Sequence, residues 1–319
     1  MLLVAMNDSH DAARPAPKAS VVIPTYNRRA FLERCLKSLL RQTAPGDLYE
    51  LVVVDDGSTD GTADLVAELA AAAPCAVRYH RQPNSGRARA RNAGIRLARG
   101  EYIIFLDSDM VVDDGFIAAH LACHAEGGRI VHGQVINTPD WEEPQKAEPK
   151  LSDCSRAFFA TGNVSLERAK LLEAGLFSEE FTEYGWEDLE LGTRLRRLGL
   201  VAVKCPAARS WHYLPRLTYA QVPQIIQREH ERGHMAVLYY RMHPEWRVKL
   251  ATLLTTPFFA FDRLLSPGHW PEHPATLRLL ERLDRPATHR LFRSLMAFVR
   301  NHAYAEGLRE GLRNAQRKS

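Results

Sequence analysis

Two pairs of carboxylates in this sequence have the residue types and the spacing for metal and nucleotide chemistry. Asp107 and Asp109 lie two residues apart directly after an apolar run, and Asp55 and Asp56 follow another. Carboxylate oxygens are ligands that Mg²⁺ and Mn²⁺ prefer, and such an ion can neutralise charge on a departing diphosphate. Carboxylates also accept hydrogen bonds from nucleotide hydroxyl and N–H groups. Either motif alone is also typical of a solvated turn or a helix cap, so its surroundings must decide.

The surrounding pattern predicts elements that would bring these carboxylates together. Buried strands are expected at 20–24, 51–54, 77–80 and 102–106, and helices at 31–40, 62–72 and 86–98. Apolar strands that alternate with helices indicate an α/β fold, with a mostly parallel sheet covered on both faces. Ligands of such sheets bind at the carboxyl ends of the strands. Both acidic motifs and Tyr26, which could stack on a base or simply pack, would lie there.

The pattern changes after residue 135. A long mobile loop rich in Pro, Glu and Lys is expected at 137–153, where Trp141 could close over a substrate. A helix at 187–198 and a strand at 201–205 follow, and the signal is helical from about Thr218. We therefore predict three segments: a flexible leader (1–19), a catalytic domain (20–217, with a nucleotide-binding part at 20–110 and an acceptor and catalytic part at 111–217) and a helical C-terminal region (218–319).

Motifs in a fixed order give the sequence a family resemblance. The strings VVIPTYNR, LVVVDDGSTDGT and GRARARNAGIRLARGEYIIFLDSD, followed by TGN and GWED, resemble the family 2 glycosyltransferases over roughly residues 20–215. The resemblance implies the GT-A fold, which is Rossmann-like, here with a helical C-terminal extension. It also implies a hexosyltransferase that moves a sugar from a nucleotide-sugar donor to an acceptor hydroxyl on a glycan, a lipid-linked molecule or another compound. A UDP-sugar is favoured, GDP-mannose and dTDP-rhamnose stay open, and the implied cofactor is Mn²⁺ or Mg²⁺.

The resemblance also implies a role for each residue that matches the family's motifs. The nucleotide would contact Pro24, Tyr26, Asp55, Asp56, Arg91, Asn92 and Asp107, with Asp55 supporting the turn. The donor and acceptor sugars would contact Gly162, Asn163, Trp186 and Glu187. Asp107 and Asp109 would bind the metal, and His212 is a third candidate ligand because GT-A relatives place a histidine at a similar point. Asp188 would be the general base, with Glu187 beside it as an acceptor for sugar hydroxyls.

The assignment of Asp188 has a physical argument of its own. Transfer with inversion needs a carboxylate that takes the proton of the attacking hydroxyl. Asp188 lies at the N-terminus of a predicted helix, where the helix dipole keeps a carboxylate ionised. Ordinary N-terminal helix charge is the other interpretation.

Three alternatives compete with this interpretation. The region around GWED also resembles retaining peptide N-acetylgalactosaminyltransferases, but Asn commonly stands there in place of Asp188, which favours inversion. A nucleotide-sugar-binding module without catalysis would use Asp188 only as a helix cap. A dinucleotide dehydrogenase is excluded because no GxGxxG follows any predicted strand.

Charge and cysteine content restrict the compartment and the partners. The chain of 319 residues has a net charge of +4, yet residues 276–319 hold ten basic and four acidic residues, so the remainder is slightly acidic. This distribution argues against a nucleic-acid partner.

Five widely spaced cysteines without a CxxC pair fit a reducing cytoplasm. No signal peptide or membrane-spanning run is evident. The basic amphipathic C-terminal helices either pack on the catalytic domain, which we favour, or contact the inner face of an anionic membrane.

Overall fold

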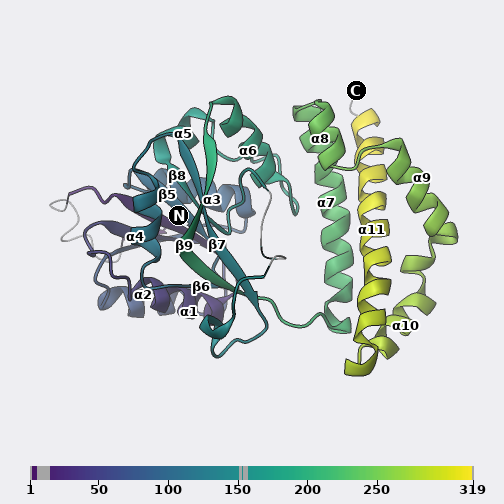
Figure 1. Ribbon diagram of the computed structural model, residues 1–319, viewed down its shortest axis with the longest axis horizontal. Helices are drawn as coiled ribbons and strands as arrows, with labels where there is room; N and C mark the ends of the chain where they lie inside the picture. Colours follow the sequence, from purple (N-terminus) through teal and green to yellow (C-terminus); the bar gives the residue numbers. More distant parts are fainter. Residues whose placement is uncertain (1, 6–14, 151–152, 154–156, 318–319) are drawn as a thin grey trace. The chain divides into compact units, whose positions relative to one another are not determined.

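The computed structural model describes residues 2–5, 15–150, 153 and 157–317. The chain divides into two compact units (Figure 1). The first, here called the sheet unit, comprises Met1–Glu179 and Asp188–Pro215. The second, here called the helical unit, comprises Glu180–Glu187 and Arg216–Ser319.

A mixed sheet forms the centre of the sheet unit. Within the described residues its strand order is β1-β4-β3-β2-β5-β8-β7-β9-β6. The neighbours β4, β3, β2 and β5 are parallel, as are β7 and β9, whereas β1, β6 and β8 run antiparallel to their partners. The strands are β1 (Leu2–Ala5), β2 (Ala19–Thr25), β3 (Tyr49–Asp55), β4 (Ala76–Arg81), β5 (Tyr102–Leu106), β6 (Met110–Val112), β7 (Arg129–Thr138), β8 (Asn163–Glu167) and β9 (Val201–Tyr213).

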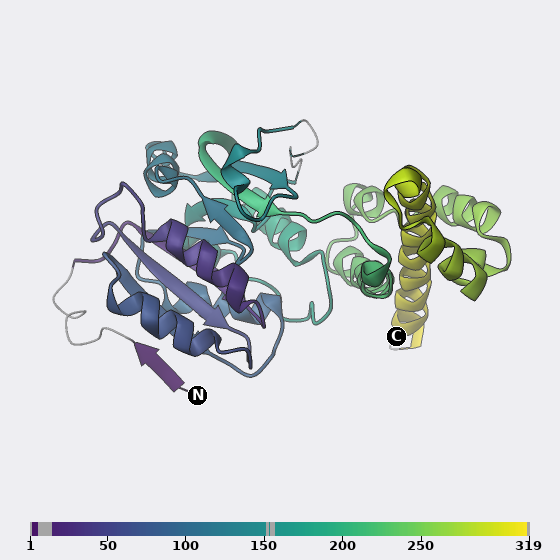
Figure 2. The ribbon, with the colours of Figure 1, turned by 90° about the horizontal axis from the view of Figure 1, so that it is seen from below.

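Helices cover both faces of this sheet, as the apolar runs predict. Along β2, Val21 and Ile23 face one core, whereas Val22 faces the other, because successive side chains of a strand point to opposite faces. Helices α1, α2 and α4 contribute to the first core and α3, α5 and α6 to the second; Figure 2 shows α1 and α2 side by side. The helices are α1 (Arg29–Leu39), α2 (Thr62–Ala71), α3 (Arg87–Leu97), α4 (Phe116–Cys123), α5 (Arg168–Glu173) and α6 (Glu187–Arg197).

Two expectations about irregular segments need correction. Residues 2–5, inside the expected leader, form β1 and pair with β4, while residues 6–14 lie outside the described part of the chain. The expected loop at 137–153 is anchored: the ring of Trp141 packs 4.6 Å from Phe31 and 5.0 Å from Tyr213, and Trp211 donates a hydrogen bond to the backbone of Ala147. Residues 151–152 of that loop lie outside the described residues.

The helical unit is built around two long helices, α7 (Val222–Met242) and α11 (His289–Arg317), which lie side by side (Figure 1). Glycines permit their close approach: a Cβ on Gly233 would lie 2.2 Å from the Tyr304 carbonyl oxygen, and one on Gly307 would lie 2.0 Å from that of His230. The shorter elements are η4 (Tyr219–Gln221), α8 (Trp246–Ala251), α9 (Thr256–Leu265), η5 (Pro267–Glu272), α10 (Pro274–Leu283) and η6 (Pro286–Thr288). Among the described residues, no helix combines the length and the apolar character that crossing a bilayer requires.

Most apolar side chains of the predicted amphipathic C-terminal helices pack inside the helical unit. Leu280 is buried against Val222 and Phe292, and Leu277, Leu283 and Leu295 pack on the same cluster. Leu291 and Phe298 stay exposed, at 61% and 41%. Contact of these helices with a membrane stays a prediction.

A buried histidine network lies between α4, β8 and β9. Asn163 Nδ2 donates to the Ala208 carbonyl, so its Oδ1 accepts from His120 Nε2 at 2.9 Å. His120 Nδ1 then accepts from the Ser165 hydroxyl at 2.8 Å, and the same Ser165 oxygen accepts from His124 Nε2 at 2.7 Å. The bond that His120 Nδ1 accepts from Ser165 needs a neutral imidazole. Burial accordingly lowers the pKa of His120 to about 3 and that of His124 to about 4.

These pKa values predict that the sheet unit loses stability in mild acid. Between pH 6.5 and about 4 the unfolded chain binds protons at His120 and His124 that the folded chain excludes. The free energy of unfolding should therefore fall with falling pH, by up to about 1.4 kcal/mol per pH unit for each histidine. Urea denaturation across this range measures the slope. It should be flatter for His124→Gln and unchanged for His273→Gln, which alters an exposed histidine; equal slopes in all three proteins would contradict the explanation.

Candidate active site

The carboxyl ends of three adjacent parallel strands position the acidic motifs. β2, β3 and β5 end at Thr25, Asp55 and Leu106, and β2 lies between the other two. The turns that follow these strands therefore share one edge of the sheet. This edge holds Tyr26, Asp56 and the Asp107–Asp109 motif.

Asp109 has the environment of a cation ligand. Its Oδ2 forms an ion pair with Arg28 Nη1 and lies 3.7 Å from His212 Nε2. Its Oδ1 is buried and has no hydrogen-bond partner among the described residues. Burial alone would raise the pKa of Asp109, but the hydrogen bond and charge of His212 and the charge of Arg28 outweigh it and lower this pKa to about 2. An ionised carboxylate with an unpaired buried oxygen is the feature that a divalent cation would satisfy.

Strand register explains why His212 lies beside Asp109. Met110, the first residue of β6, is opposite His212 in the β6–β9 ladder, so Asp109 immediately precedes that pair. In the β7–β9 ladder Asn137 is opposite the same histidine. His212 Nδ1 is 2.9 Å from Asn137 Oδ1, and Asn137 Nδ2 donates to Asp153 Oδ1 at 2.9 Å. Because the amide oxygen accepts, His212 carries a proton on Nδ1, and Nε2 faces Asp109. When protonated, Nε2 pairs with the carboxylate; when neutral, it has a lone pair for a cation.

Asn137 is therefore expected to tune metal affinity without touching a metal ion. Replacing it with Ala removes the acceptor that fixes the His212 tautomer, and we expect about tenfold weaker Mn²⁺ binding, the scale found for partners of metal-ligating histidines. Titration of the full chain with Mn²⁺, followed by electron paramagnetic resonance, measures the affinity. Asn137→Asp loses the donor to Asp153 but keeps the acceptor for His212, and it should bind Mn²⁺ more tightly than Asn137→Ala. Equal affinities for the unmodified protein and Asn137→Ala would refute this role.

Asp188 is tied to the same edge through Arg91 and Thr161. Asp188 Oδ2 accepts from the Thr161 hydroxyl at 2.9 Å and from the Thr161 backbone N–H at 3.1 Å. The Arg91 guanidinium, whose side chain is 5% exposed, lies 3.5 Å from Asp188 Oδ1 and 3.6 Å from Asp107 Oδ1. One guanidinium thus contacts both carboxylates. Gly162 is adjacent: a Cβ there would lie 3.7 Å from Asp107 Oδ2.

The second acidic pair is buried in its turn. Asp55 accepts from the Ser58 backbone N–H and from the Tyr79 hydroxyl, as expected of a residue that supports the turn. Asp56 accepts from Gln82 Nε2 and from the backbone N–H groups of Ser85 and Gly86, at 2.7 to 2.9 Å. It therefore anchors the loop before α3.

Two residues at the start of this edge differ in exposure. Tyr26, which follows β2, is 48% exposed, whereas Pro24 lies within β2 and is half-buried. The Tyr26 ring is thus accessible to a ligand at the carboxyl edge.

Four of the expected site residues have side chains that are buried or hydrogen-bonded within their own unit. Asn92 clamps the Phe177 backbone with two hydrogen bonds of 2.9 Å and also donates to Glu179. Asn163 belongs to the histidine network described above. Trp186 donates to the Arg232 carbonyl and packs 5.8 Å from the Tyr239 ring, inside the helical unit. Glu187 is buried and belongs to that unit too, whereas Asp188 belongs to the sheet unit.

The sequence interpretation missed three residues that complete the edge. Arg28 pairs with Asp109, Asn137 orients His212, and Thr161 holds Asp188. Arg28 follows β2 by three residues, so its position after a strand was a usable signal. Thr161 begins the TGN motif, from which only Gly162 and Asn163 were assigned a role. Asn137 acts through strand register, for which one sequence gives no signal.

Comparison with known proteins shows similarity to glycosyltransferases. Residues 20–171 match the family model "Glycosyl transferase family 2". Validoxylamine A glucosyltransferase of Streptomyces hygroscopicus subsp. limoneus is 34% identical over 228 residues, covering 59% of this chain and 50% of that protein. The chain spans about half the length of the two validoxylamine A glucosyltransferases that it matches.

Two solved structures share the fold. The mannosyltransferase PcManGT from Pyrobaculum calidifontis, in complex with GDP-Man and Mn²⁺, has a TM-score of 0.60 at 21% identity, covering 96% of this chain and 89% of that one. GalNAc-T7 with UDP, GalNAc and Mn²⁺ has a TM-score of 0.51 at 21% identity, covering 61% and 43%. Both likenesses concern the fold alone. With the motif order and the family match together, residues 20–171 of this chain belong to glycosyl transferase family 2.

Proposed function

We propose that this protein is a metal-dependent glycosyltransferase that moves a sugar from a nucleotide-sugar donor to an acceptor hydroxyl with inversion. The observation that carries the proposal is the Asp109 carboxylate, ionised and partly unpaired beside His212 Nε2, at the edge that Asp188 also reaches. Residues 20–217 would form the catalytic domain. Family membership of residues 20–171 supports the reaction class.

Asp109 and His212 would hold the metal ion, with Asp107 beside them. A divalent cation there would neutralise the negative charge that develops on the nucleoside diphosphate as it leaves. Mn²⁺ in the two solved complexes supports this choice, and carboxylate oxygens such as those of Asp107 and Asp109 suit Mn²⁺. Arg28 now pairs with Asp109 and is 38% exposed. The guanidinium would also suit a diphosphate, because it can donate two parallel hydrogen bonds to two phosphate oxygens.

Asp188 would take the proton of the acceptor hydroxyl. Thr161 fixes the carboxylate orientation through two donors to Oδ2, which restricts rotation about the side chain. Arg91 fixes the spacing between Asp188 and Asp107, because it contacts both. A carboxylate held in place at a site of developing charge needs little reorganisation when the hydroxyl attacks. This arrangement supports inversion, and the anomeric configuration of the product, read by NMR, tests it.

The donor is tested by a panel of nucleotide sugars with Mn²⁺. A UDP-sugar is our first choice, and the GDP-Man in one fold neighbour keeps GDP-mannose in the panel. Release of UDP, GDP or dTDP is measured for each donor, with and without simple sugar acceptors. Turnover of one donor identifies it; binding of a nucleotide with Mn²⁺ but no turnover with any donor or acceptor would instead support a binding module.

A further inference from the structure

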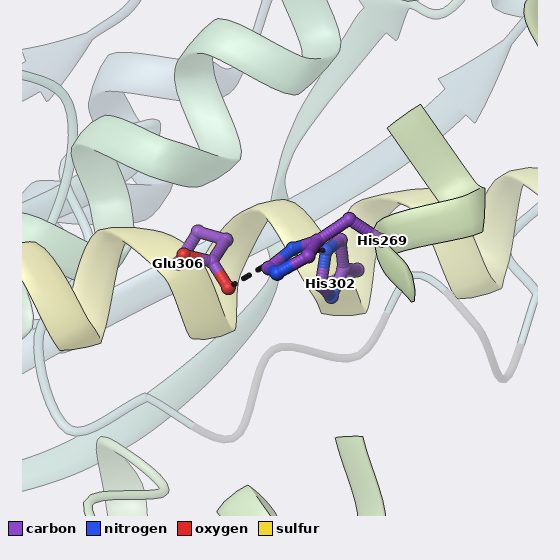
Figure 3. Close-up of side chains that lie close together, drawn as sticks. All are labelled: His269, His302 and Glu306. Atoms are coloured by element: carbon purple, nitrogen blue, oxygen red, sulfur yellow. Dashed lines mark hydrogen bonds and ion pairs between the residues drawn. The ribbon is translucent and has the colours of Figure 1, made fainter. Parts of the chain in front are cut away.

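Three potential metal ligands converge within the helical unit. His302 and Glu306 lie four residues apart on α11, so they share one helix face, and His269 reaches them from η5 (Figure 3). One ligand atom from each lies within 4.8 Å of the other two. His269 Nδ1 is 3.1 Å from His302 Nε2 and 3.7 Å from Glu306 Oε1.

A buried carboxylate sets the tautomer of His302. Asp262 Oδ1, on α9, lies 3.0 Å from His302 Nδ1, and the two side chains are only 5% and 2% exposed. The proton of His302 is thereby held on Nδ1, and Nε2 presents its lone pair to His269 and Glu306. A carboxylate behind a histidine is the usual support of a metal-ligating imidazole.

The spacing of the nitrogens suits a tetrahedral zinc site. Two imidazole nitrogens bound at 2.0–2.1 Å to Zn²⁺ lie about 3.3 Å apart at the tetrahedral angle, close to the observed separation. Glu306 Oε1 also accepts from Arg309 Nη1 at 2.5 Å. A carboxylate has enough lone pairs to keep that contact and bind a cation.

The backbone of η5 is also shaped for this contact. Gly268 has φ +65° and His269 has φ +55°, in the left-handed region that residues other than glycine rarely adopt. The simpler alternative is a neutral hydrogen bond from His269 Nδ1–H to His302 Nε2. In that alternative Glu306 only pairs with Arg309, whereas a cation uses all three groups. The His269 side chain is 69% exposed, so water and ions have access to the open side.

We propose that His269, His302 and Glu306 bind one Zn²⁺ ion, with water as the fourth ligand, and that this ion ties η5 to α11. The site belongs to the helical unit and is separate from the Asp109 cluster. Its role is structural, because it cross-links a short irregular segment to the longest helix of the unit.

Zinc binding is tested on the full chain carrying Asp109→Asn and His212→Ala, which removes the other candidate metal site. Competition with a chromophoric chelator and metal analysis after gel filtration give affinity and stoichiometry. We expect one Zn²⁺ per chain and a rise in melting temperature on adding it. His269→Asn in this background should bind at least about tenfold more weakly, and Asn tolerates the left-handed backbone. Glu306→Gln should also weaken binding.

The matched control is His273→Asn, which removes an exposed histidine four residues from His269. It should bind Zn²⁺ as the parent does. The proposal would be overturned if the protein, at micromolar concentration, retained less than one Zn²⁺ per chain after gel filtration. Unchanged Zn²⁺ affinity after His269→Asn would overturn it as well. Equal weakening by His273→Asn and His269→Asn would do so as well, because binding would then be a general property of surface histidines.

Discussion

An Asp109→Asn variant is expected to lose Mn²⁺-dependent nucleotide release by roughly 10³-fold. Asn has nearly the same shape as Asp, so the turn after β5 should persist. The variant side chain would lack the negative charge that attracts both Arg28 and the cation. A neutral amide atom would replace the buried, unpaired Oδ1. Several kcal/mol of charge stabilisation depend on the cation, and each 1.4 kcal/mol corresponds to a factor of ten.

Steady-state assays at increasing Mn²⁺ concentration measure this loss. The matched control is Asp114→Asn, which neutralises an exposed aspartate five residues further along; its activity should equal that of the unmodified protein. Mn²⁺ titration should also show weaker metal binding for Asp109→Asn. A variant that keeps its Mn²⁺ activation would remove Asp109 from the metal site.

An Asp188→Asn variant is expected to bind donor normally but to transfer sugar about 10² to 10⁴ times more slowly. The Asn side-chain oxygen can still accept the two hydrogen bonds from Thr161, so the local structure should persist. An amide cannot take the proton of the acceptor hydroxyl. The loss should therefore appear in kcat, while the Kd for nucleotide with Mn²⁺ stays nearly constant.

Glu173→Gln is the control for this change, because Glu173 is an exposed carboxylate on α5 that pairs with Lys170. It should leave kcat unaltered. If Asp188→Asn lowered donor affinity and kcat equally, Asp188 would be a donor-binding residue. If it altered neither, another group would have to serve as the base.

Apolar periodicity was sufficient to predict the strands and helices that carry the acidic motifs. The runs at 20–24, 51–54 and 102–106 became β2, β3 and β5 with ends shifted by at most two residues. Their parallel pairing follows from the helices between them, and it places Asp56 and Asp109 at one edge. The short prediction for β9 was wrong in length: exposed residues such as Lys204 and Arg209 interrupt its apolar pattern, although the strand runs to Tyr213.

Side-chain direction could not be predicted in the same way. Arg91 and Asn92 are neighbours in one motif, yet successive residues of a helix point about 100° apart. Arg91 consequently reaches Asp107 and Asp188, whereas Asn92 binds the Phe177 backbone. Trp186 has φ +75°, a local conformation that a sequence pattern does not reveal. Its indole N–H donates to the Arg232 carbonyl within the helical unit.

The most direct test of the proposed function is nucleotide release from the donor panel, measured in parallel with Mn²⁺ and with a chelator. The unmodified protein should release nucleoside diphosphate from one donor class with Mn²⁺, and the chelator should abolish the release. Activity that is equal with and without metal would contradict a catalytic role for the Asp109 and His212 cluster. Complete inactivity towards every donor and acceptor, despite metal-dependent nucleotide binding, would contradict the transferase itself.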